Sequence, residues 1–252
     1  MSSINQVVDT LLYKDELNPK FWENPTTPEN ASLKKEVRKK LMEISDEFFE
    51  YLDLDLFISD ITMTGSLANF NWSDFSDVDL HFIFDYEQVA GNEEIYREYF
   101  NLKKTLFNST HDIKIFGHDV EIYIQDLLEP HHSTGVYSVL HNDWINVPKK
   151  EEIEIDKDVL KKKIKNVVSQ LEDVFLNLDD ENPKTSIKIL DNFKEKLKKY
   201  RSAGLDKGGE KSYENLVFKY LRRTGYIQKI FDAKNKIIDK TLSLESHNRK
   251  KR

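Results

Sequence analysis

Two aspartates separated by a single residue mark the start of an apolar stretch of the chain. Asp77 and Asp79 lie at the beginning of this stretch, Val78–Phe84, in which apolar residues alternate with polar ones as far as His81. Because alternate residues of a β-strand project from the same face, a strand here directs both carboxylates and His81 to one side. Two carboxylates so close together repel each other unless a cation neutralises them. Mg²⁺ accepts one or two carboxylates together with phosphate oxygens and water, so we predict a divalent-metal site.

A second alternating stretch, residues 120–125, supplies a third carboxylate. Apolar residues hold its even-numbered positions, and Glu121 lies on the polar face. If this strand lies beside residues 78–84 with the apolar faces aligned, Glu121 faces Asp77 and Asp79. Three carboxylates can hold two metal ions about 4 Å apart, an arrangement that suits in-line phosphoryl transfer.

A Gly-Ser turn precedes the aspartate pair at Gly65 and Ser66. Together with Asp77, Asp79 and Glu121, this turn resembles the motif set of the DNA polymerase β nucleotidyltransferase superfamily. The resemblance implies that the turn and the Ser66 hydroxyl hold nucleotide phosphates, and that Asp77 and Asp79 bind two Mg²⁺ or Mn²⁺ ions with the triphosphate. It also implies that Glu121 binds the second ion and helps to activate an acceptor hydroxyl. Members often carry Asp at this third position, and Glu is a known variant.

Further stretches resemble short nucleotidyltransferases predicted in large tailed phages, and they cover most of the chain. They are Asn18–Trp22, Asp60–Ile61, Asn69–Trp72, Ser76–His81, His111–Ile113, Gly117–Glu121 and Ser133–Ser138. This resemblance implies a fold and a class of reaction. It does not imply an acceptor.

A glycine pair, Gly208-Gly209, precedes a helical pattern in the C-terminal part of the chain. The N-terminus of a helix presents free amides and the positive end of its dipole, which favours phosphate. We therefore expect Lys211, Ser212 and Lys219 to contact the triphosphate.

The expected fold class is α+β: a small mixed, mainly antiparallel sheet with flanking helices, followed by a helical domain. Residues 3–13 and a stretch from Ser32 to Leu52 have helical periodicity, and we expect both helices to pack against the sheet. Strands are expected at 56–64, 78–84, 111–116, 119–125, 136–140 and 144–147, with helices at 93–108, 157–177, 184–200 and 212–240. The polar stretch 148–152 divides a catalytic domain, 1–150, from a helical domain, 151–252, that closes the nucleotide cleft.

Charge and composition narrow the classes of partner. The chain has 252 residues, no cysteine and a net charge of −7, so thiolate metal sites and disulfide scaffolds are excluded. Residues 201–252 carry 14 Lys and Arg against 6 Asp and Glu, whereas residues 1–200 carry 24 against 39. The acidic body argues against binding of duplex DNA, and the basic segment leaves short RNA open. With neither an apolar run long enough for a membrane nor a secretory signal, we expect a cytoplasmic protein, in the host cytoplasm if the chain is phage-encoded.

Several side chains near the motif allow two interpretations. Phe70, Trp72 and Phe75 either stack a base or pack their loop against the sheet, and packing is favoured. His81 is either a neighbour of the metal or a structural histidine. The remaining histidines of interest, His118, His131 and His132, are expected to lie in loops rather than to bind zinc.

The sequence therefore predicts an enzyme that transfers a nucleoside monophosphate from an NTP to an acceptor hydroxyl and releases pyrophosphate. RNA, a protein, a second nucleotide or a small molecule remain open as acceptors. The alternatives are an inactive nucleotide- or RNA-binding module of the same fold and a purely structural phage component.

Overall fold

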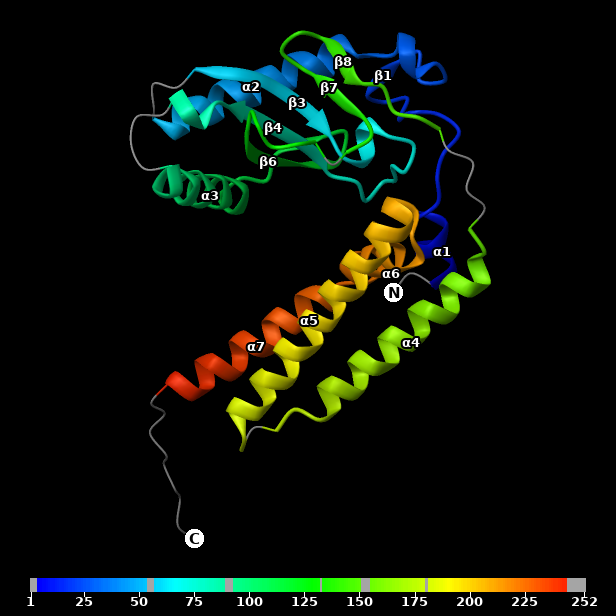
Figure 1. Ribbon diagram of the computed structural model, residues 1–252, viewed down its shortest axis with the longest axis vertical. Coiled ribbons are helices and arrows are strands. Elements are labelled where there is room, and N and C mark those ends of the chain that lie inside the picture. The colour runs from blue at the N-terminus through cyan, green and yellow to red at the C-terminus, as the bar shows by residue number, and fades with distance from the viewer. Residues whose placement is uncertain are drawn as a thin grey trace. The chain divides into compact units, whose positions relative to one another are not determined.

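The computed structural model describes residues 4–53, 57–88, 93–131, 133–150, 155–179 and 181–243. The chain forms two compact units (Figure 1). Leu12–Glu152 make up one, called here the sheet unit. The other, called the helical unit, consists of Met1–Leu11 and Ile153–Arg252.

A six-stranded sheet forms the centre of the sheet unit, with the strand order β5-β6-β4-β3-β7-β8. The strands are β3 (Ile58–Thr64), β4 (Val78–Phe84), β5 (Lys114–Ile115), β6 (His118–Asp126), β7 (Val136–Ser138) and β8 (Asp143–Asn146). Neighbours β4 and β6 are parallel, and the other pairs in this sheet are antiparallel. The expectation of an α+β fold with a mixed, mainly antiparallel sheet is confirmed.

Two long helices, α2 (Lys35–Leu52) and α3 (Glu93–Thr110), share the apolar core of the sheet unit. The ring of Phe48 in α2 lies 4.9 Å from that of Phe82 in β4 and 5.0 Å from that of Phe107 in α3. The alternation along β4 buries Val78, Leu80, Phe82 and Phe84 in this core, which leaves Asp79 and His81 for the other face of the sheet.

The segment before α2 differs from the sequence prediction. We expected Ser32 to open the helix, but Ser32–Leu33 form strand β2, which pairs with β1 (Trp22–Glu23) in a two-stranded antiparallel sheet. This pairing uses the backbone of Ser32 in the ladder, so α2 begins only at Lys35. Three 3₁₀ turns complete the sheet unit: η1 (Pro28–Asn30), η2 (Ser66–Ala68) and η3 (Tyr86–Gln88).

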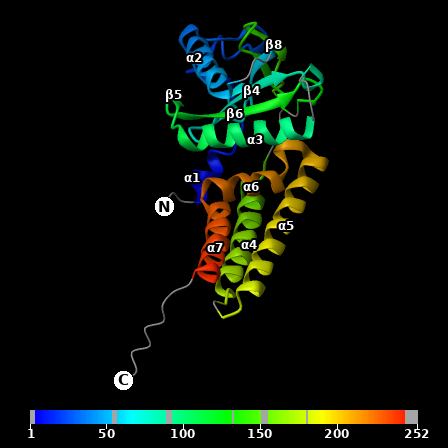
Figure 2. The ribbon, with the colours of Figure 1, turned by 90° about the vertical axis from the view of Figure 1, so that its left-hand side faces the viewer.

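The helical unit is built from α1 (Ile4–Asp9), α4 (Lys157–Leu176), α5 (Pro183–Gly208), η4 (Gly209–Lys211), α6 (Tyr213–Arg223) and α7 (Tyr226–Leu242) (Figure 2). Helix α1 was expected to pack against the sheet. Instead, Val8 and Leu11 belong to the apolar core of the C-terminal helices. Arg223 fixes this position, because its guanidinium donates to the Thr10 carbonyl at 2.8 Å and to the Thr10 hydroxyl at 2.7 Å.

Glycines change two of the expected helix boundaries. The helix expected over 184–200 continues through Gly204 to the end of α5, and a Cβ at Gly204 would lie 2.5 Å from Glu214 Cβ in α6. A single helix expected over 212–240 is instead divided into α6 and α7 at Gly225, which has a φ of 76°. Close helix packing explains the first difference, and a left-handed backbone explains the second.

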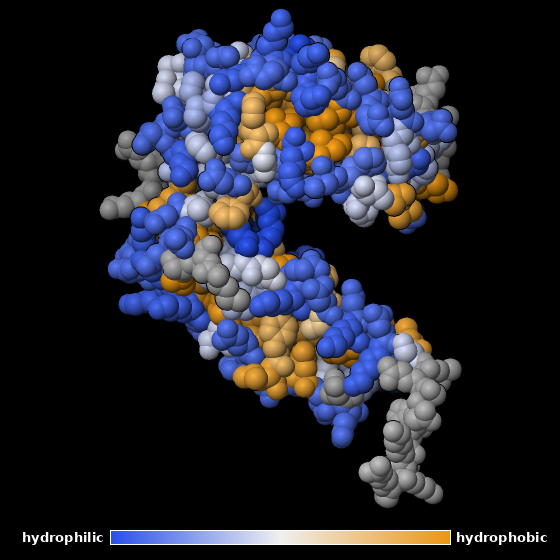
Figure 3. Space-filling model, turned by 180° about the vertical axis from the view of Figure 1, so that it is seen from behind, coloured by the Kyte–Doolittle hydropathy of each residue, from blue (hydrophilic) through white to orange (hydrophobic). Residues whose placement is uncertain are grey.

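Hydrophilic side chains cover most of the face drawn in Figure 3, and apolar side chains are visible in restricted patches of both units. Among the described residues, no helix is both long enough and apolar enough to span a membrane.

Candidate functional site

The sheet places two of the predicted site residues side by side. In the parallel ladder of β4 and β6, Asp79 is the partner of Glu121. On the other side of β4, Asp79 is the partner of Thr64, the last residue of β3. Adjacent strands lie about 4.8 Å apart, so both acidic side chains project from one face at neighbouring positions. The expected pairing of these two strands is confirmed, and Asp77 directly precedes β4.

The Gly-Ser turn lies directly against the second aspartate. Gly65 follows β3 and has a φ of 71°, a conformation that other residues adopt only with strain. A Cβ at this position would lie 1.6 Å from Oδ2 of Asp79. Only glycine therefore allows the carboxylate of Asp79 to approach the backbone of the turn this closely.

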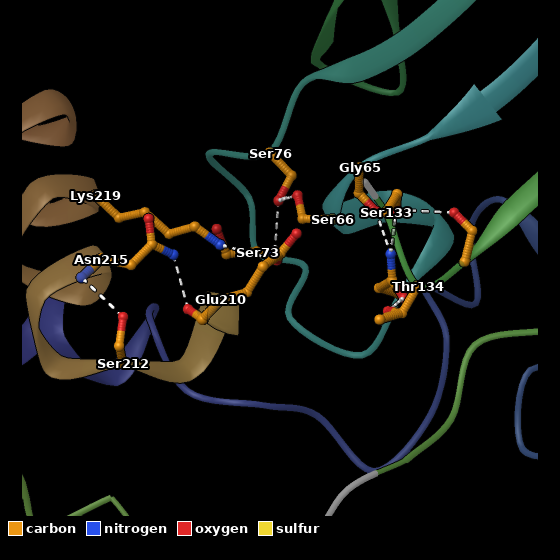
Figure 4. Close-up of polar contacts among 12 residues, drawn as sticks. Gly65, Ser66, Ser73, Ser76, Ser133, Thr134, Glu210, Ser212, Asn215 and Lys219 are labelled. Carbon is orange, nitrogen blue, oxygen red and sulfur yellow. Dashed lines mark hydrogen bonds and ion pairs between the residues drawn. The ribbon is translucent and has the colours of Figure 1, made fainter. Parts of the chain in front are cut away.

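A hydrogen bond closes the loop between Ser66 and the aspartate pair (Figure 4). The hydroxyls of Ser66 and Ser76 are 2.7 Å apart, and the Ser73 amide donates to Ser76 Oγ at 2.9 Å. Ser76 immediately precedes Asp77. The turn and the start of β4 are thus held together at both ends of the loop.

Hydrogen bonds of Asn69 connect the same turn to the segment before β7, in which Figure 4 labels Ser133 and Thr134. The amide Nδ2 of Asn69 donates to the Gly65 carbonyl at 2.7 Å and to Ser133 Oγ at 3.1 Å, and its Oδ1 accepts from the Thr134 hydroxyl at 2.7 Å. A Cβ at Gly135 would lie 2.0 Å from the Ala68 carbonyl oxygen, so this segment passes very close to the turn.

A cavity of about 340 Å³ opens beside the acidic residues. Its lining consists of Asp77, Asn108, His111, Asp112, Ile113, Asp119, Val120 and Glu121. Asp77 and Glu121 therefore face the same space. Lys114 bridges Asp112 at 2.6 Å and Asp119 at 2.9 Å, and its hydrogen bonds to these carboxylates raise the pKa of Lys114 to about 12.

The structure brings the three carboxylates to one end of the sheet but does not arrange them as metal ligands. In the part of the chain that is described, no group of three or more His, Asp or Glu side chains is placed to hold a metal ion. The chemistry of the donors nevertheless fits a hard divalent cation, which prefers carboxylate oxygens. Asp79 and Glu121 are cross-strand partners, so their side chains leave the backbone at neighbouring positions of one face.

A polar row lies behind these residues on the same face of the sheet. His81 stacks on Tyr123 with ring centroids 4.7 Å apart, and its Nδ1 lies 3.0 Å from Gln125 Oε1. Burial lowers the pKa of His81 to about 4, although the hydrogen bond with Gln125 acts in the opposite direction. His81 is therefore neutral near pH 7. Its partner in β3, Thr62, has a buried hydroxyl without a hydrogen-bond partner in the described structure.

One of the histidines expected in loops is structural. His118 is the first residue of β6 and only 3% of it is exposed. Its Nδ1 lies 2.7 Å from the Ser76 carbonyl oxygen, and its ring packs edge-on against Phe21. His118 thus helps to fix the backbone just before Asp77. His131 lies outside the helices and strands, as expected, and His132 is outside the described residues.

The aromatic residues of the loop between Gly65 and Asp77 divide into two kinds. Phe70 is buried, and the half-buried Trp72 donates from Nε1 to the Glu16 carbonyl at 2.8 Å. Both serve packing, as favoured from the sequence. Phe75 is 55% exposed, which leaves its ring accessible.

Lys211, Ser212 and Lys219 belong to the helical unit. Ser212 caps α6, because its hydroxyl accepts from the Asn215 amide at 3.3 Å (Figure 4). Asn215 Nδ2 donates to the Glu210 carbonyl at 2.7 Å, and Lys219 Nζ lies 3.6 Å from the Glu210 carboxylate. The hydroxyl of Ser212 and the amine of Lys219 thus already have partners within the helical unit. That these three residues contact a triphosphate stays a prediction.

Several residues that shape the site have no role that the sequence alone indicates. Asn69, Ser76, His118 and Gly135 position the turn and the aspartate pair without carrying the chemistry themselves. Asn108 is similar, because its side chain pairs with both the amide and the carbonyl of Ile122, next to Glu121. A small polar residue in a loop gives no signal for a long-range contact.

No protein-family model, curated protein or solved structure matches this chain.

Proposed function

We propose that this chain is a metal-dependent nucleotidyltransferase. One observation supports the proposal most strongly: Gly65 lies against the carboxylate of Asp79, and Asp79 is the strand partner of Glu121. A fold does not need a glycine with positive φ beside one carboxylate and a second carboxylate next to it, since adjacent carboxylates repel each other. Chemistry on a phosphate ester with a divalent cation does need these groups.

In the proposed reaction, an acceptor hydroxyl oxygen forms a bond to the α-phosphorus of an NTP. The bond between that phosphorus and the bridging oxygen breaks, and pyrophosphate leaves. The amides and the hydroxyl of Gly65-Ser66 hold phosphate oxygens. Asp77 and Asp79 would hold Mg²⁺ or Mn²⁺ beside the triphosphate. Glu121 lines the cavity and takes up the proton of the acceptor hydroxyl. When bound, the cations neutralise charge on the triphosphate and on the leaving group.

The test uses each α-labelled NTP with Mg²⁺ or Mn²⁺ and separate pools of tRNA, total RNA and cell protein, and it measures both transferred label and released pyrophosphate. Asp79→Ala and Asp79→Asn are expected to lower transfer at least about 1,000-fold. Asp74→Asn is the matched control, because Asp74 is an exposed carboxylate in the same loop and should leave the rate unchanged.

Three outcomes contradict part or all of the proposal. The enzyme assignment fails if no pairing of NTP and pool gives label or pyrophosphate. The metal assignment fails if Asp79→Ala retains full activity. Thermal stabilisation by NTP and Mg²⁺ without any transfer would instead indicate an inactive binding module.

A further inference from the structure

Helices α5, α6 and α7 enclose a groove that has no part in the proposed reaction. Its volume is about 200 Å³. The apolar lining consists of Leu197, Phe218, Ile227, Ile230 and Phe231, and three cations of α5 complete it: Lys194, Lys198 and Arg201. The lining contains no carboxylate.

The three cations form a line along one edge of the groove. Residues four and three positions apart share one face of a helix, so Lys194, Lys198 and Arg201 span about 10 Å along α5. Lys194 Nζ lies 4.6 Å from the ring centre of Phe231, and Arg201 Cζ lies 4.6 Å from that of Phe218. These contacts with aromatic rings hold Lys194 and Arg201 beside the apolar side chains of the groove.

Within the described part of the chain, Arg201 at this edge donates from Nε to Asn215 Oδ1 at 3.1 Å. None of the three cations forms an ion pair there, whereas the nearby Lys234 pairs with Asp191 at 2.7 Å. Burial lowers the pKa of Arg201, the positive charge of Arg222 acts in the same direction, and Glu210 opposes it. Like charges gathered at an apolar groove favour an anionic ligand.

We propose that the groove binds an acidic amphipathic helix of a partner protein, with aliphatic side chains in the apolar floor and carboxylates against the three cations. Charge complementarity and the helix-in-groove geometry support this occupant. A nucleobase fits less well, because its several donors and acceptors would be buried against apolar side chains without partners. Aliphatic side chains lose no hydrogen bonds on burial. The proposal goes beyond the transferase activity and does not depend on it.

The experiment uses the full chain and a panel of fluorescein-labelled helical peptides, in which two Leu anchors are spaced by three, four or seven residues and flanked by Glu. Fluorescence anisotropy is expected to show saturable binding of at least one member. Replacing its Leu by Ser, or its Glu by Gln, should weaken binding at least about tenfold. An oligouridylate and octanoate serve as competitors.

Exposed charged residues can be substituted without disturbing the fold. Lys198→Glu is expected to weaken peptide binding about tenfold, whereas Lys236→Glu, an equivalent reversal on α7 outside the groove, should not change it. Phe231→Ala tests the apolar wall, with circular dichroism to verify folding. The proposal is overturned if no peptide binds, or if both charge reversals act equally. Preferential, Lys198-dependent binding of oligouridylate or octanoate would also overturn it, by assigning the groove to nucleic acid or to a small amphiphile.

Discussion

The sheet unit and the helical unit both contain a glycine at a point of very close approach, but the two glycines make room for different groups. Gly65 makes room for the carboxylate of Asp79, and Gly204 makes room for the side chains of Glu214 and Ser212 at the contact of α5 with α6. The second contact stabilises the unit in which it occurs. The first brings the carboxylate of Asp79 against a turn whose backbone conformation only glycine adopts readily.

Two buried asparagines show the same contrast. Asn69 joins the turn at Gly65 to the segment 133–134, and Asn215 joins the start of α6 to Glu210 and Arg201. Each satisfies backbone and side-chain groups that would otherwise be buried without partners. Only Asn69 does so next to candidate catalytic residues. Tight contacts occur in both units, so a candidate site is distinguished by the groups that such contacts surround.

The largest effect, on the rate of nucleotide transfer, is expected for glycine substitutions in the sheet unit. Gly65→Ala should lower nucleotide transfer at least about 100-fold, because the new methyl group displaces the carboxylate of Asp79. Gly117→Ala is the matched control: Gly117 also has a positive φ, 86°, but a Cβ there meets no atom within 4 Å. Both variants should lose about 1 kcal/mol of unfolding free energy through backbone strain. Equal loss of activity in the two would show that strain, and not the position of Asp79, controls transfer.

Substitution of the two asparagines tests the difference between the units, because stability and activity are measured for the same variants. Asn69→Ala and Asn215→Ala should each lower the free energy of unfolding by about 2 kcal/mol, because each leaves buried polar groups unpaired. Tryptophan fluorescence follows the sheet unit alone, since Trp22, Trp72 and Trp144 all lie in it. At a temperature where both variants are folded, transfer should fall only for Asn69→Ala. A similar fall for Asn215→Ala would remove the distinction between the units.

Helix packing gives a somewhat smaller effect. Gly204→Ala should destabilise the helical unit by about 1–2 kcal/mol, because the methyl group overlaps Glu214 Cβ. Gly208→Ala is the control near the end of the same helix, where the closest atom is 3.3 Å away. Hydrogen exchange of amides in α5 and α6 measures the change locally. The packing explanation is wrong if the two variants exchange alike.

The smallest effect is expected at the ion pair of Lys163 and Glu214, whose charged atoms are 2.9 Å apart. Burial is the largest single influence on Glu214 and acts to raise its pKa. The hydrogen bond from Lys163, a backbone hydrogen bond and the charges of Lys163 and Lys207 together outweigh burial, so the pKa of Glu214 is lowered. The hydrogen bond with Glu214 raises the pKa of Lys163. Both side chains are partly exposed, so the pair contributes less than about 1 kcal/mol.

The contribution of this pair depends on pH in a defined way. A lowered carboxyl pKa stabilises above the unfolded value and is lost as the pH falls through the folded one. A raised amine pKa stabilises below its unfolded value and is lost as the pH rises through the folded one. A double-mutant cycle of Lys163→Met and Glu214→Gln should therefore show coupling near pH 7 that disappears in acid below the ordinary Glu range. Coupling that persists there would contradict an ionic origin.

The sequence was sufficient to predict those parts of the fold that depend on local periodicity. Alternation in residues 78–84 and 120–125 predicted which side chains share a face. The strands expected at 111–116 and 119–125 correspond to the antiparallel pair of β5 and β6, with Gly117 between them. Both follow from the period of a strand and from turn chemistry. The adjacency of Asp79 and Glu121 followed from aligning the two apolar faces.

Contacts between distant segments were beyond such patterns. Ser32–Leu33 pair with Trp22–Glu23, so the helix does not begin at Ser32 as expected. The apolar face of α1 packs against the C-terminal helices, although its pattern is equally compatible with packing against a sheet. Burial of His118 depends on the Ser76 carbonyl, which no spacing reveals. Periodicity shows which face of a segment is buried. Which element covers that face depends on the packing of the whole fold, and a local pattern does not show it.

The parallel pairing of β4 with β6 has a consequence for the order in which the protein acquires its acidic cluster during synthesis. Parallel neighbours cannot be joined by a tight turn, and here α3 and β5 lie between them in the chain. The aspartate strand therefore leaves the ribosome well before Glu121 does. A nascent or truncated chain that ends within α3 holds two of the three carboxylates and lacks the strand that carries the third. Any activity that needs all three is thus absent until synthesis has passed the middle of the sheet unit.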